Sequence, residues 1–441
     1  MSYPGKMLKA QVNGNQTFQT IDGFGVNINS KYWKKGQLIP AMDLLLDDLG
    51  ATIYRVDIYG KSNWIDPDGS VGSSSLNPEN LARLYQGEIF QDGWGMMRYL
   101  NSKNIEPYLT ASGDVPKWML GPDRKSLIDH EAFCEMLISM VEWAKTKENL
   151  KFRYFGPLNE TDIGSPEGPS VTPTEFVKVC EVLDAKLTQK GLEDIQLVVG
   201  EQAAFDTYYL RELLASRKLA HRIGVFSMHD YADYPPEVYK NVSDLIRDSH
   251  YADRRLWMGE FGDLDQTGDM EWYVAWVIAS RLLDQLSAGF NASLVWDAFD
   301  NYHDHNEAWT IYGLLRTGLN VYTPKKRYYA CKQVFRFVPP GFTRLGVDVK
   351  SPDIRLLAFA NPDRTQITLV GMNLSTSNYY LDIQLDGFPE GLMKGKVSYF
   401  RTSEVENCYM IGKIPVTTMN YPFTGIAAHI PPDCIFTLTT L

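Results

Sequence analysis

The 441-residue sequence has no excess of positive charge and no long apolar run. It carries 43 Lys and Arg against 54 Asp and Glu, a formal net charge of −11. Nucleic acids and anionic membranes select basic surfaces, so this balance argues against nucleic acid and membrane as partners. No stretch reaches the roughly 18 uninterrupted apolar residues that a membrane-spanning helix requires. The composition therefore predicts a soluble, acidic protein.

Cysteine is scarce and shows no pattern. The five cysteines are odd in number, and none is spaced as CxxC. This excludes a disulfide framework and a zinc site built on cysteine. The N-terminal stretch MSYPGKMLKA lacks the apolar segment of a secretory signal peptide. We expect a cytoplasmic protein without metal or other cofactor, or a secreted one if a leader was removed.

Glycine-rich phosphate motifs are also missing, whereas short β-prone runs are frequent. Neither GxGxxG nor GxxxxGK[ST] occurs, which disfavours a doubly wound nucleotide-binding sheet. Amphipathic segments separate eight β-prone runs, which are IDGFGVNI, TIYRVDIY, EPYLTAS, FRYFGPL, IQLVVG, GVFSMHD, LWMGEF and ASLVWDAF. Eight β-then-α units predict a (β/α)8 barrel over residues 21–335.

One of the amphipathic segments carries clear helix signals. Thr172 and Glu175 have the spacing of a capping box, Pro173 occupies the first helical position, and Gly191 follows the end. The sequence therefore predicts a helix between the fourth and fifth strands.

The pattern changes after about residue 336. The runs IRLLAFANP, TQITLVGMNLS, NYYLDIQLDG, KVSYFRTS and CIFTLTTL are separated by turn residues and show no helical period. They predict an antiparallel β-sandwich or small barrel. The strand-like MLKAQV and QTFQTI precede the barrel and are expected to join that sandwich. The side domain is then 1–20 plus 336–441, joined to the barrel at VPPGF (338–342).

Two carboxylates follow distant strands of the predicted barrel. Glu160, preceded by Asn159, comes after FRYFGPL, and Glu260 lies in RRLWMGEFGD. Catalytic groups of such barrels stand at the C-terminal ends of the strands. A protonated and an ionised carboxyl group facing each other are the minimum apparatus for hydrolysing a glycosidic bond. With 54 acidic residues, solvated loop carboxylates are the competing interpretation.

Several stretches in this order resemble one family of enzymes. They are QTIDGFGVNIN (19–29), YRVDIYG (54–60), ASGDVPKWM (111–119), the Asn159-Glu160 pair and YYACKQVFRFVPPGFTRL (328–345). Together they resemble clan A of the glycoside hydrolases, most closely family 30, over essentially the whole length. The resemblance implies Glu160 as general acid/base, Glu260 as nucleophile, and retention of anomeric configuration. The two carboxyl groups are then expected roughly 5–5.5 Å apart.

Other residues at strand ends are candidates for the substrate site. Asn159 is expected to hydrogen-bond a sugar hydroxyl, and Arg55 to hydrogen-bond the Glu260 carboxylate and keep it ionised, or else to form a structural ion pair. His229 and Tyr231, in SMHDY, are expected to hydrogen-bond the nucleophile or a sugar hydroxyl. A satisfied core histidine is the alternative for His229.

Tryptophans supply candidate stacking surfaces. Trp296 in LVWDAF is predicted to be the floor for a pyranose ring, and Trp118 a second, weaker candidate; core packing is the alternative. For Trp33 and Trp64 core packing is the better interpretation. The stretch NYHDHNEAW (301–309) is expected to be a loop at the cleft rim and not a metal site.

The sequence thus predicts a retaining glycoside hydrolase acting on a β-linked glycan or oligosaccharide. An inactive carbohydrate-binding protein on the same fold, or a clan A glycosidase of another family such as 39 or 5, are the alternatives. A phosphate-dependent isomerase or aldolase is disfavoured, because no phosphate-gripping loop and no strand lysine is evident.

Overall fold

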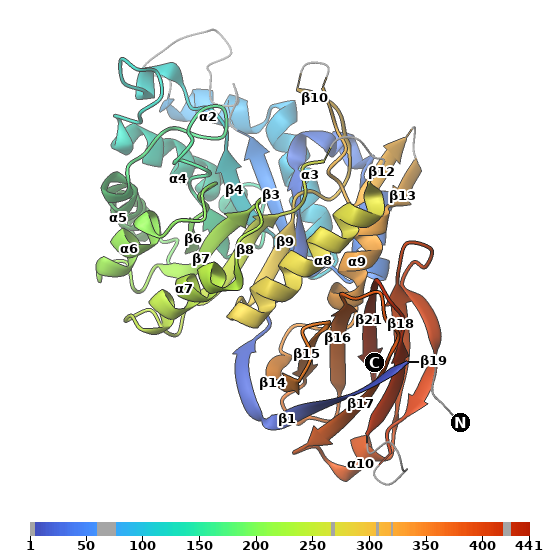
Figure 1. The fold of residues 1–441 in the computed structure, drawn as a ribbon. Helices are drawn as coiled ribbons and strands as arrows, with labels where there is room; N and C mark the ends of the chain where they lie inside the picture. Colours follow the sequence, from blue (N-terminus) through green and yellow to red (C-terminus); the bar gives the residue numbers. More distant parts are fainter. Residues whose placement is uncertain (1–4, 60–75, 266–269, 306–307, 319–320, 418–424) are drawn as a thin grey trace.

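The computed structural model describes residues 5–59, 76–265, 270–305, 308–318, 321–417 and 425–441. The chain forms a barrel with surrounding helices and, below it in Figure 1, a separate β-domain that includes the N-terminal strand. The predicted fold class is confirmed: a (β/α)8 barrel carries a β-sandwich-like domain.

Eight parallel strands close the barrel, in the order of the sequence. Each strand pairs in parallel with its two neighbours, and the last strand pairs with the first, which closes the barrel. They are β2 (Gly23–Asn29), β3 (Ile53–Tyr59), β4 (Tyr108–Ser112), β5 (Tyr154–Gly156), β6 (Gln196–Gly200), β7 (Ile223–Asp230), β8 (Arg255–Phe261) and β9 (Ala292–Val295). All eight predicted β-prone runs are strands. The strands are buried on both faces, as the near-continuous apolar runs require.

Helices cover the outside of the barrel. They are α1 (Ile39–Asp43), α2 (Pro78–Tyr85), α3 (Glu88–Ser102), α4 (His130–Thr146), α5 (Pro173–Gln189), α6 (Tyr208–Ala215), α7 (Pro236–Arg247), α8 (Glu271–Ala288) and α9 (Lys326–Phe335). At the start of α5 the predicted capping box is present: Thr172 and Glu175 each bond the other's backbone. In the described residues, no helix is both long and apolar enough to cross a bilayer.

The β-domain of the described chain is one nine-stranded sheet in the order β19-β18-β21-β16-β15-β14-β1-β17-β20. Its strands are β1 (Lys6–Thr20), β14 (Thr343–Val349), β15 (Ile354–Ala360), β16 (Ile367–Asn373), β17 (Tyr379–Asp386), β18 (Lys396–Thr402), β19 (Tyr409–Pro415), β20 (Ile426–Ile430) and β21 (Cys434–Thr439). A bridge between Val416 and Ile426 brings the two ends of the sheet together, so the sheet curls around its own apolar core.

The N-terminal strand is continuous where the sequence suggested two short strands. β1 pairs with β14 on one side and β17 on the other, with register shifts between Asn13 and Thr17 and between Thr17 and Thr20. Such irregularities bend a strand. β1 therefore links the side domain to the barrel, where the Asn291 side chain donates to the Thr20 carbonyl over 2.8 Å.

The segment after β9 differs from the expectation. The stretch 301–309, predicted as a loop, contains β10 (Asn301–His305) and begins β11 (Ala308–Thr310), which pair with each other. A second hairpin, β12 (Leu315–Gly318) with β13 (Val321–Pro324), follows. Both hairpins were missed because strands of three to five residues are too short to show a clear alternation in the sequence.

Candidate active site

Glu160 and Glu260 stand at the C-terminal ends of two barrel strands. Glu160 follows β5 after a short connection, and Glu260 is the penultimate residue of β8. Glu160 has a left-handed backbone, with φ of 44°. Non-glycine residues seldom adopt this conformation, and functional sites are enriched in such residues. Both side chains are almost fully buried, with 8% and 5% exposure.

The two carboxyl groups lie close together although 100 positions separate them in sequence. One side-chain oxygen of Glu160 and one of Glu260 lie within 4.8 Å of each other, and a nitrogen of His229 lies within the same distance of both. The barrel topology produces this approach, because parallel strands bring their C-terminal ends to one rim. The predicted pair therefore shares one location.

Arg55 connects the groups at this rim. Its Nη1 donates to Glu260 Oε1 over 2.5 Å and to Asn27 Oδ1 over 2.8 Å, and its Nη2 donates to Asn159 Oδ1 over 2.7 Å. Arg55 is 1% exposed. A planar guanidinium with several donors suits this role, since one side chain orients an acid and two amides at once.

Tyr231 and His229 contact the two carboxyl groups from β7 and the residues that follow it. The Tyr231 hydroxyl donates to Glu260 Oε2 over 2.6 Å. His229 Nδ1 lies 2.8 Å from Glu160 Oε1 and 3.6 Å from Glu260 Oε2. The hydrogen-bond partner of His229 is thus Glu160, whereas the sequence had suggested the nucleophile or a sugar hydroxyl. Tyr231 and Arg55 together occupy both oxygens of Glu260.

A bulge in β8 sets the direction of Glu260. Met228 pairs with Met258, but the next residue, His229, pairs with Glu260, so Gly259 is the extra residue. Bulges re-aim the side chains that follow them. A Cβ atom at Gly259 would lie 2.1 Å from Glu201 Oε1, which a real side chain does not permit. The WMGEF motif therefore needs its glycine.

Glu201 is a third carboxylate in this cluster, and the sequence analysis did not single it out. It follows β6 directly, in IQLVVGEQ, and is completely buried. Its Oε2 lies 2.7 Å from Arg55 Nη2, and its backbone carbonyl accepts a hydrogen bond of 2.8 Å from the Glu160 amide. The signal that could have found it was the one used for Glu160 and Glu260: an acid at the end of a barrel strand.

Burial and neighbouring charge set the ionisation of these groups. Burial lowers the pKa of His229, but Glu260, Glu160 and Glu201 together raise it to about 10, so the ring is an imidazolium at neutral pH. Burial raises the pKa of Glu260 above its ordinary value; His229 and Arg55 oppose this shift, Glu160 adds to it, and the Tyr231 hydrogen bond opposes it. Burial alone would raise the pKa of Glu201, but Arg55, His229 and Ser227 lower it to about 2.

Two more carboxyl groups lie near the rim. Asp57, two residues beyond Arg55 on β3, accepts a hydrogen bond of 2.6 Å from the Ser112 hydroxyl, and burial raises its pKa to about 6. Glu167, on the loop after β5, has a pKa of about 7 because of burial first and then repulsion from Glu160 and Glu260. The rim therefore gathers acidic groups, whose burial and mutual repulsion favour their neutral forms.

The candidate aromatic residues are placed as follows. Trp296 comes directly after β9, is partly exposed, and its backbone amide bonds the Phe261 carbonyl over 2.8 Å. Trp118 lies in the 3-10 turn Lys117–Met119 and is partly buried against the main core. Trp33 is 6% exposed and packs on Tyr99, as core packing predicts. Trp64 lies outside the described residues.

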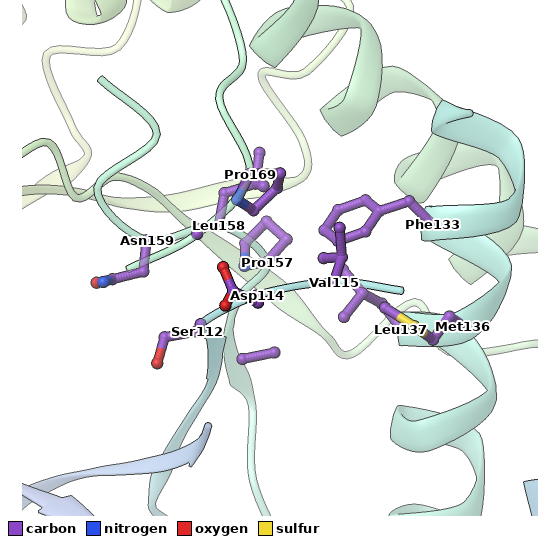
Figure 2. Close-up of a pocket in the computed structure, with 13 residues that line it drawn as sticks. Ser112, Asp114, Val115, Phe133, Met136, Leu137, Pro157, Leu158, Asn159 and Pro169 are labelled. Atoms are coloured by element: carbon purple, nitrogen blue, oxygen red, sulfur yellow. The ribbon is translucent and has the colours of Figure 1, made fainter. Parts of the chain in front are cut away.

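A small pocket has Asn159 in its wall. It is bounded by the loop after β4, the residues after β5 and the start of α4. Figure 2 shows Phe133 and Leu137 pointing into it from α4, whereas the Asn159 side chain points away from it. The pocket wall is mostly apolar, so its packing fixes the backbone from which Asn159 reaches Arg55.

The Glu160, His229 and Glu260 cluster also has the spacing of metal ligands. The chemistry of the donors does not fit a cation. His229 is an imidazolium whose Nδ1 bonds Glu160, and the Arg55 guanidinium is already hydrogen-bonded to Glu260. A metal ligand must be an unprotonated nitrogen or a carboxylate free of competing cations. Two resident positive groups supply the charge that a metal would bring.

Comparison with known proteins identifies solved structures that share this fold. No protein-family model and no curated sequence matches the chain. A glycoside hydrolase family 30 endoxylanase from Clostridium papyrosolvens C71 matches in structure with a TM-score of 0.74 at 17% identity, over 98% of this chain and 99% of that one. SrfJ from Salmonella typhimurium matches with a TM-score of 0.75 at 12% identity, over 100% and 93%. The endo-β1,6-glucanase BT3312 gives 0.71 at 14%, over 100% and 95%. The chain thus has the fold of solved glycoside hydrolases, family 30 among them, along its whole length.

Proposed function

We propose that this protein is a retaining glycoside hydrolase that cleaves β-glycosidic bonds in a glycan or oligosaccharide. The observation that carries the proposal is the approach of Glu160 and Glu260 to within 4.8 Å at the rim of the barrel. Retaining enzymes hold their two carboxyl groups about 5–5.5 Å apart, whereas inverting enzymes leave roughly 6.5–9.5 Å for a water molecule. The close approach of one oxygen from each side chain favours the retaining arrangement.

In the first step, a Glu260 oxygen attacks the anomeric carbon while the glycosidic C–O bond breaks. Glu160 gives its proton to the departing oxygen. Arg55 and Tyr231 hold the two oxygens of Glu260 by hydrogen bonds of 2.5 and 2.6 Å, so the side chain is aimed before the sugar arrives. The product of this step is a sugar esterified to Glu260.

In the second step, water attacks the same anomeric carbon and the bond to Glu260 breaks. Glu160, now ionised, accepts the proton of that water. The imidazolium of His229, 2.8 Å from Glu160 Oε1, stabilises the carboxylate that Glu160 becomes after the first step. Two inversions give net retention.

The substrate is proposed to be a carbohydrate with a β-linkage at the cleaved bond. The structural relatives named above include an endoxylanase and an endo-β1,6-glucanase. Trp296 is partly exposed after β9, where an indole ring offers an apolar face to a pyranose. We propose that Asn159 supplies an amide to a sugar hydroxyl, from its position between Glu160 and Arg55.

A hydrolysis screen tests this function. Purified protein is incubated with aryl β-xylosides and β-glucosides, xylan, and β-1,6- and other β-linked glucans, and proton NMR follows the first-formed anomer. We expect release of the β-anomer from at least one substrate, and none from Glu260→Gln. An α-anomer as the first product, or equal turnover by Glu260→Gln, contradicts the proposal.

A further inference from the structure

Glu201 is a buried carboxylate that a two-carboxylate mechanism does not use. It is 0% exposed, so it does not touch a substrate. Its backbone has a left-handed φ of 61°, its amide bonds the Ser227 carbonyl, and its carbonyl accepts from the Glu160 amide. An ionised group without access to water is costly unless several partners satisfy it. Its partners therefore indicate its role.

Four side chains face the Glu201 carboxylate. Oε2 lies 2.7 Å from Arg55 Nη2 and accepts a hydrogen bond of 3.0 Å from the Tyr108 hydroxyl. His229 Nε2 lies 3.6 Å from the same oxygen. Oε1 accepts a hydrogen bond from the Ser227 hydroxyl. The two cations that contact Glu160 and Glu260 from one side are thus both held by Glu201 from the other.

Three glycines make room for this arrangement. A Cβ at Gly259 would lie 2.1 Å from Glu201 Oε1, and one at Gly156 would lie 2.2 Å from the Tyr108 hydroxyl. Gly200, with φ of 105°, would bring a Cβ to 2.2 Å from the Ser227 carbonyl oxygen. Each glycine lies where a side chain would displace Glu201 or one of its hydrogen-bond partners. The barrel rim is shaped around this carboxylate.

We propose that Glu201 is a positioning residue that keeps Arg55 and His229 charged and oriented toward Glu260 and Glu160. The catalytic consequence rests on the proposed glycosidase function, whereas the effect on the two cations does not. Arg55 contacts both Glu201 and Glu260, and His229 contacts both Glu201 and Glu160.

Loss of the Glu201 charge changes the ionisation of these groups in one direction. With Glu201→Gln, one anion fewer faces His229, so the imidazolium loses its proton at lower pH. The other titratable groups near Glu201 also lose their protons at lower pH. The alkaline limb of the pH–activity profile therefore moves to lower pH. Because Glu201 does not contact substrate, the effect falls on kcat and not on KM.

The first measurement follows the His229 ring and requires no turnover. Protein labelled with ¹⁵N-histidine is titrated by NMR between pH 6 and 10, with the His229 signals assigned from their absence in His229→Gln. We expect wild-type His229 to stay doubly protonated to about pH 9, and Glu201→Gln to lower its midpoint by at least about one pH unit. Identical titration curves overturn the proposal.

The second measurement compares kinetics on the best substrate from the screen. We expect Glu201→Gln to lower kcat about 100-fold with KM within about twofold, and to shift the alkaline limb to lower pH. Glu201→Asp, which keeps the charge, should restore the position of that limb. A rise in KM at unchanged kcat, or a normal limb, contradicts the proposal.

The matched control breaks another arginine–carboxylate pair. Asp184 Oδ1 accepts from Arg222 Nε over 2.6 Å, and Arg222 precedes β7 at the opposite end of the barrel. Asp184→Asn should leave the His229 titration and kcat unchanged. If Asp184→Asn has the same effects as Glu201→Gln, the effects are those of general destabilisation and the proposal fails.

The proposal can still be tested if Glu201→Gln does not fold or if the wild type shows no hydrolysis. If Glu201→Gln does not fold, Tyr108→Phe removes a single donor to Glu201 and should lower kcat about tenfold at constant KM; an unchanged kcat contradicts the proposal. If the wild type hydrolyses nothing, the glycosidase function fails, and the NMR titration still decides whether Glu201 holds the cations.

Discussion

The Arg55 guanidinium donates a hydrogen bond of 2.5 Å to Glu260 Oε1, across the barrel rim from β3 to β8. Both side chains are buried, and the same guanidinium also reaches Asn27, Asn159 and Glu201. A contact of this kind fixes both the direction and the charge of the carboxylate. The contact between Arg55 and Glu260 therefore affects both the stability of the barrel rim and the catalytic activity, and the two effects can be measured separately.

Arg55→Lys keeps the charge but loses the planar fork, so it should damage both properties. We expect a loss of about 3–5 kcal/mol in the free energy of unfolding, because partners of a buried ion pair are left unsatisfied. We also expect kcat to fall by at least about 100-fold. Denaturant unfolding and steady-state kinetics measure the two effects.

Arg222→Lys serves as the control for that variant. Arg222 is equally buried and bonds Asp184, but it precedes β7 at the other end of the barrel. It should lose stability and keep its kcat. Loss of activity in both variants would mean that Arg55 acts only through stability.

Glu160→Gln should separate substrates by their leaving groups. A poor leaving group needs the proton from Glu160 during bond cleavage, and a dinitrophenolate does not. We expect kcat/KM to fall about 100- to 10,000-fold for an alkyl glycoside or oligosaccharide, and less than about tenfold for the dinitrophenyl glycoside. Equal losses for both substrates would remove Glu160 from the acid role.

Tyr231→Phe should move the acid limb of the pH–activity profile. The hydrogen bond from Tyr231 is one of the influences that lower the pKa of Glu260, so its loss raises that pKa further above the ordinary value of 4.5. Glu260 must be ionised to attack, and we therefore expect the limb to shift to higher pH and kcat to fall about tenfold.

Tyr239→Phe is the matched control for Tyr231. The Tyr239 hydroxyl bonds the buried carboxylate of Asp230, which is not part of the Glu160–Glu260 cluster. The acid limb of the pH–activity profile of Tyr239→Phe should coincide with that of the wild type. A shift to lower pH in Tyr231→Phe would contradict the assigned hydrogen bond.

Glu167→Gln should make the protein more stable at alkaline pH. The folded pKa of Glu167 is about 7, above the ordinary value of 4.5, so its protonated form stabilises the fold at low pH. That stability is lost as pH rises from 4.5 through 7. Glutamine does not titrate, and we expect Tm to be about 1–2 °C above wild type at pH 8 and equal to it at pH 4. A gain at pH 4 only would reverse the sign and contradict the placement.

The barrel was predictable from sequence because its strands carry strong local signals. Each is a short apolar run, and a capping box marks the helix that begins at Pro173. In the side domain β14, β19 and β20 were missed. β19 is mostly exposed, and its YMIGKIP sequence gives no clear alternation of buried and exposed positions. These strands are specified by their pairing with strands far apart in the chain, and not by a local sequence pattern.

The candidate site was predictable in its residue types and less so in its pairings. Strand-end position pointed to Glu160, Glu260, Arg55, His229 and Tyr231. The hydrogen bond between His229 and Glu160 depends on side-chain directions, and the aim of Glu260 depends on the bulge at Gly259; no linear pattern encodes either. Glu201 had the same strand-end signal, but only its contacts distinguish it from a solvated acid.

The most direct test of the paired carboxylates is to trap the sugar on the protein. A 2-deoxy-2-fluoro β-glycoside with a good leaving group, built on the sugar that the screen identifies, should accumulate as a covalent adduct. Intact mass and peptide mapping should place one sugar on Glu260 in the wild type and none in Glu260→Gln. An adduct on any other residue, or active protein that forms no adduct and releases the inverted anomer, would contradict the account.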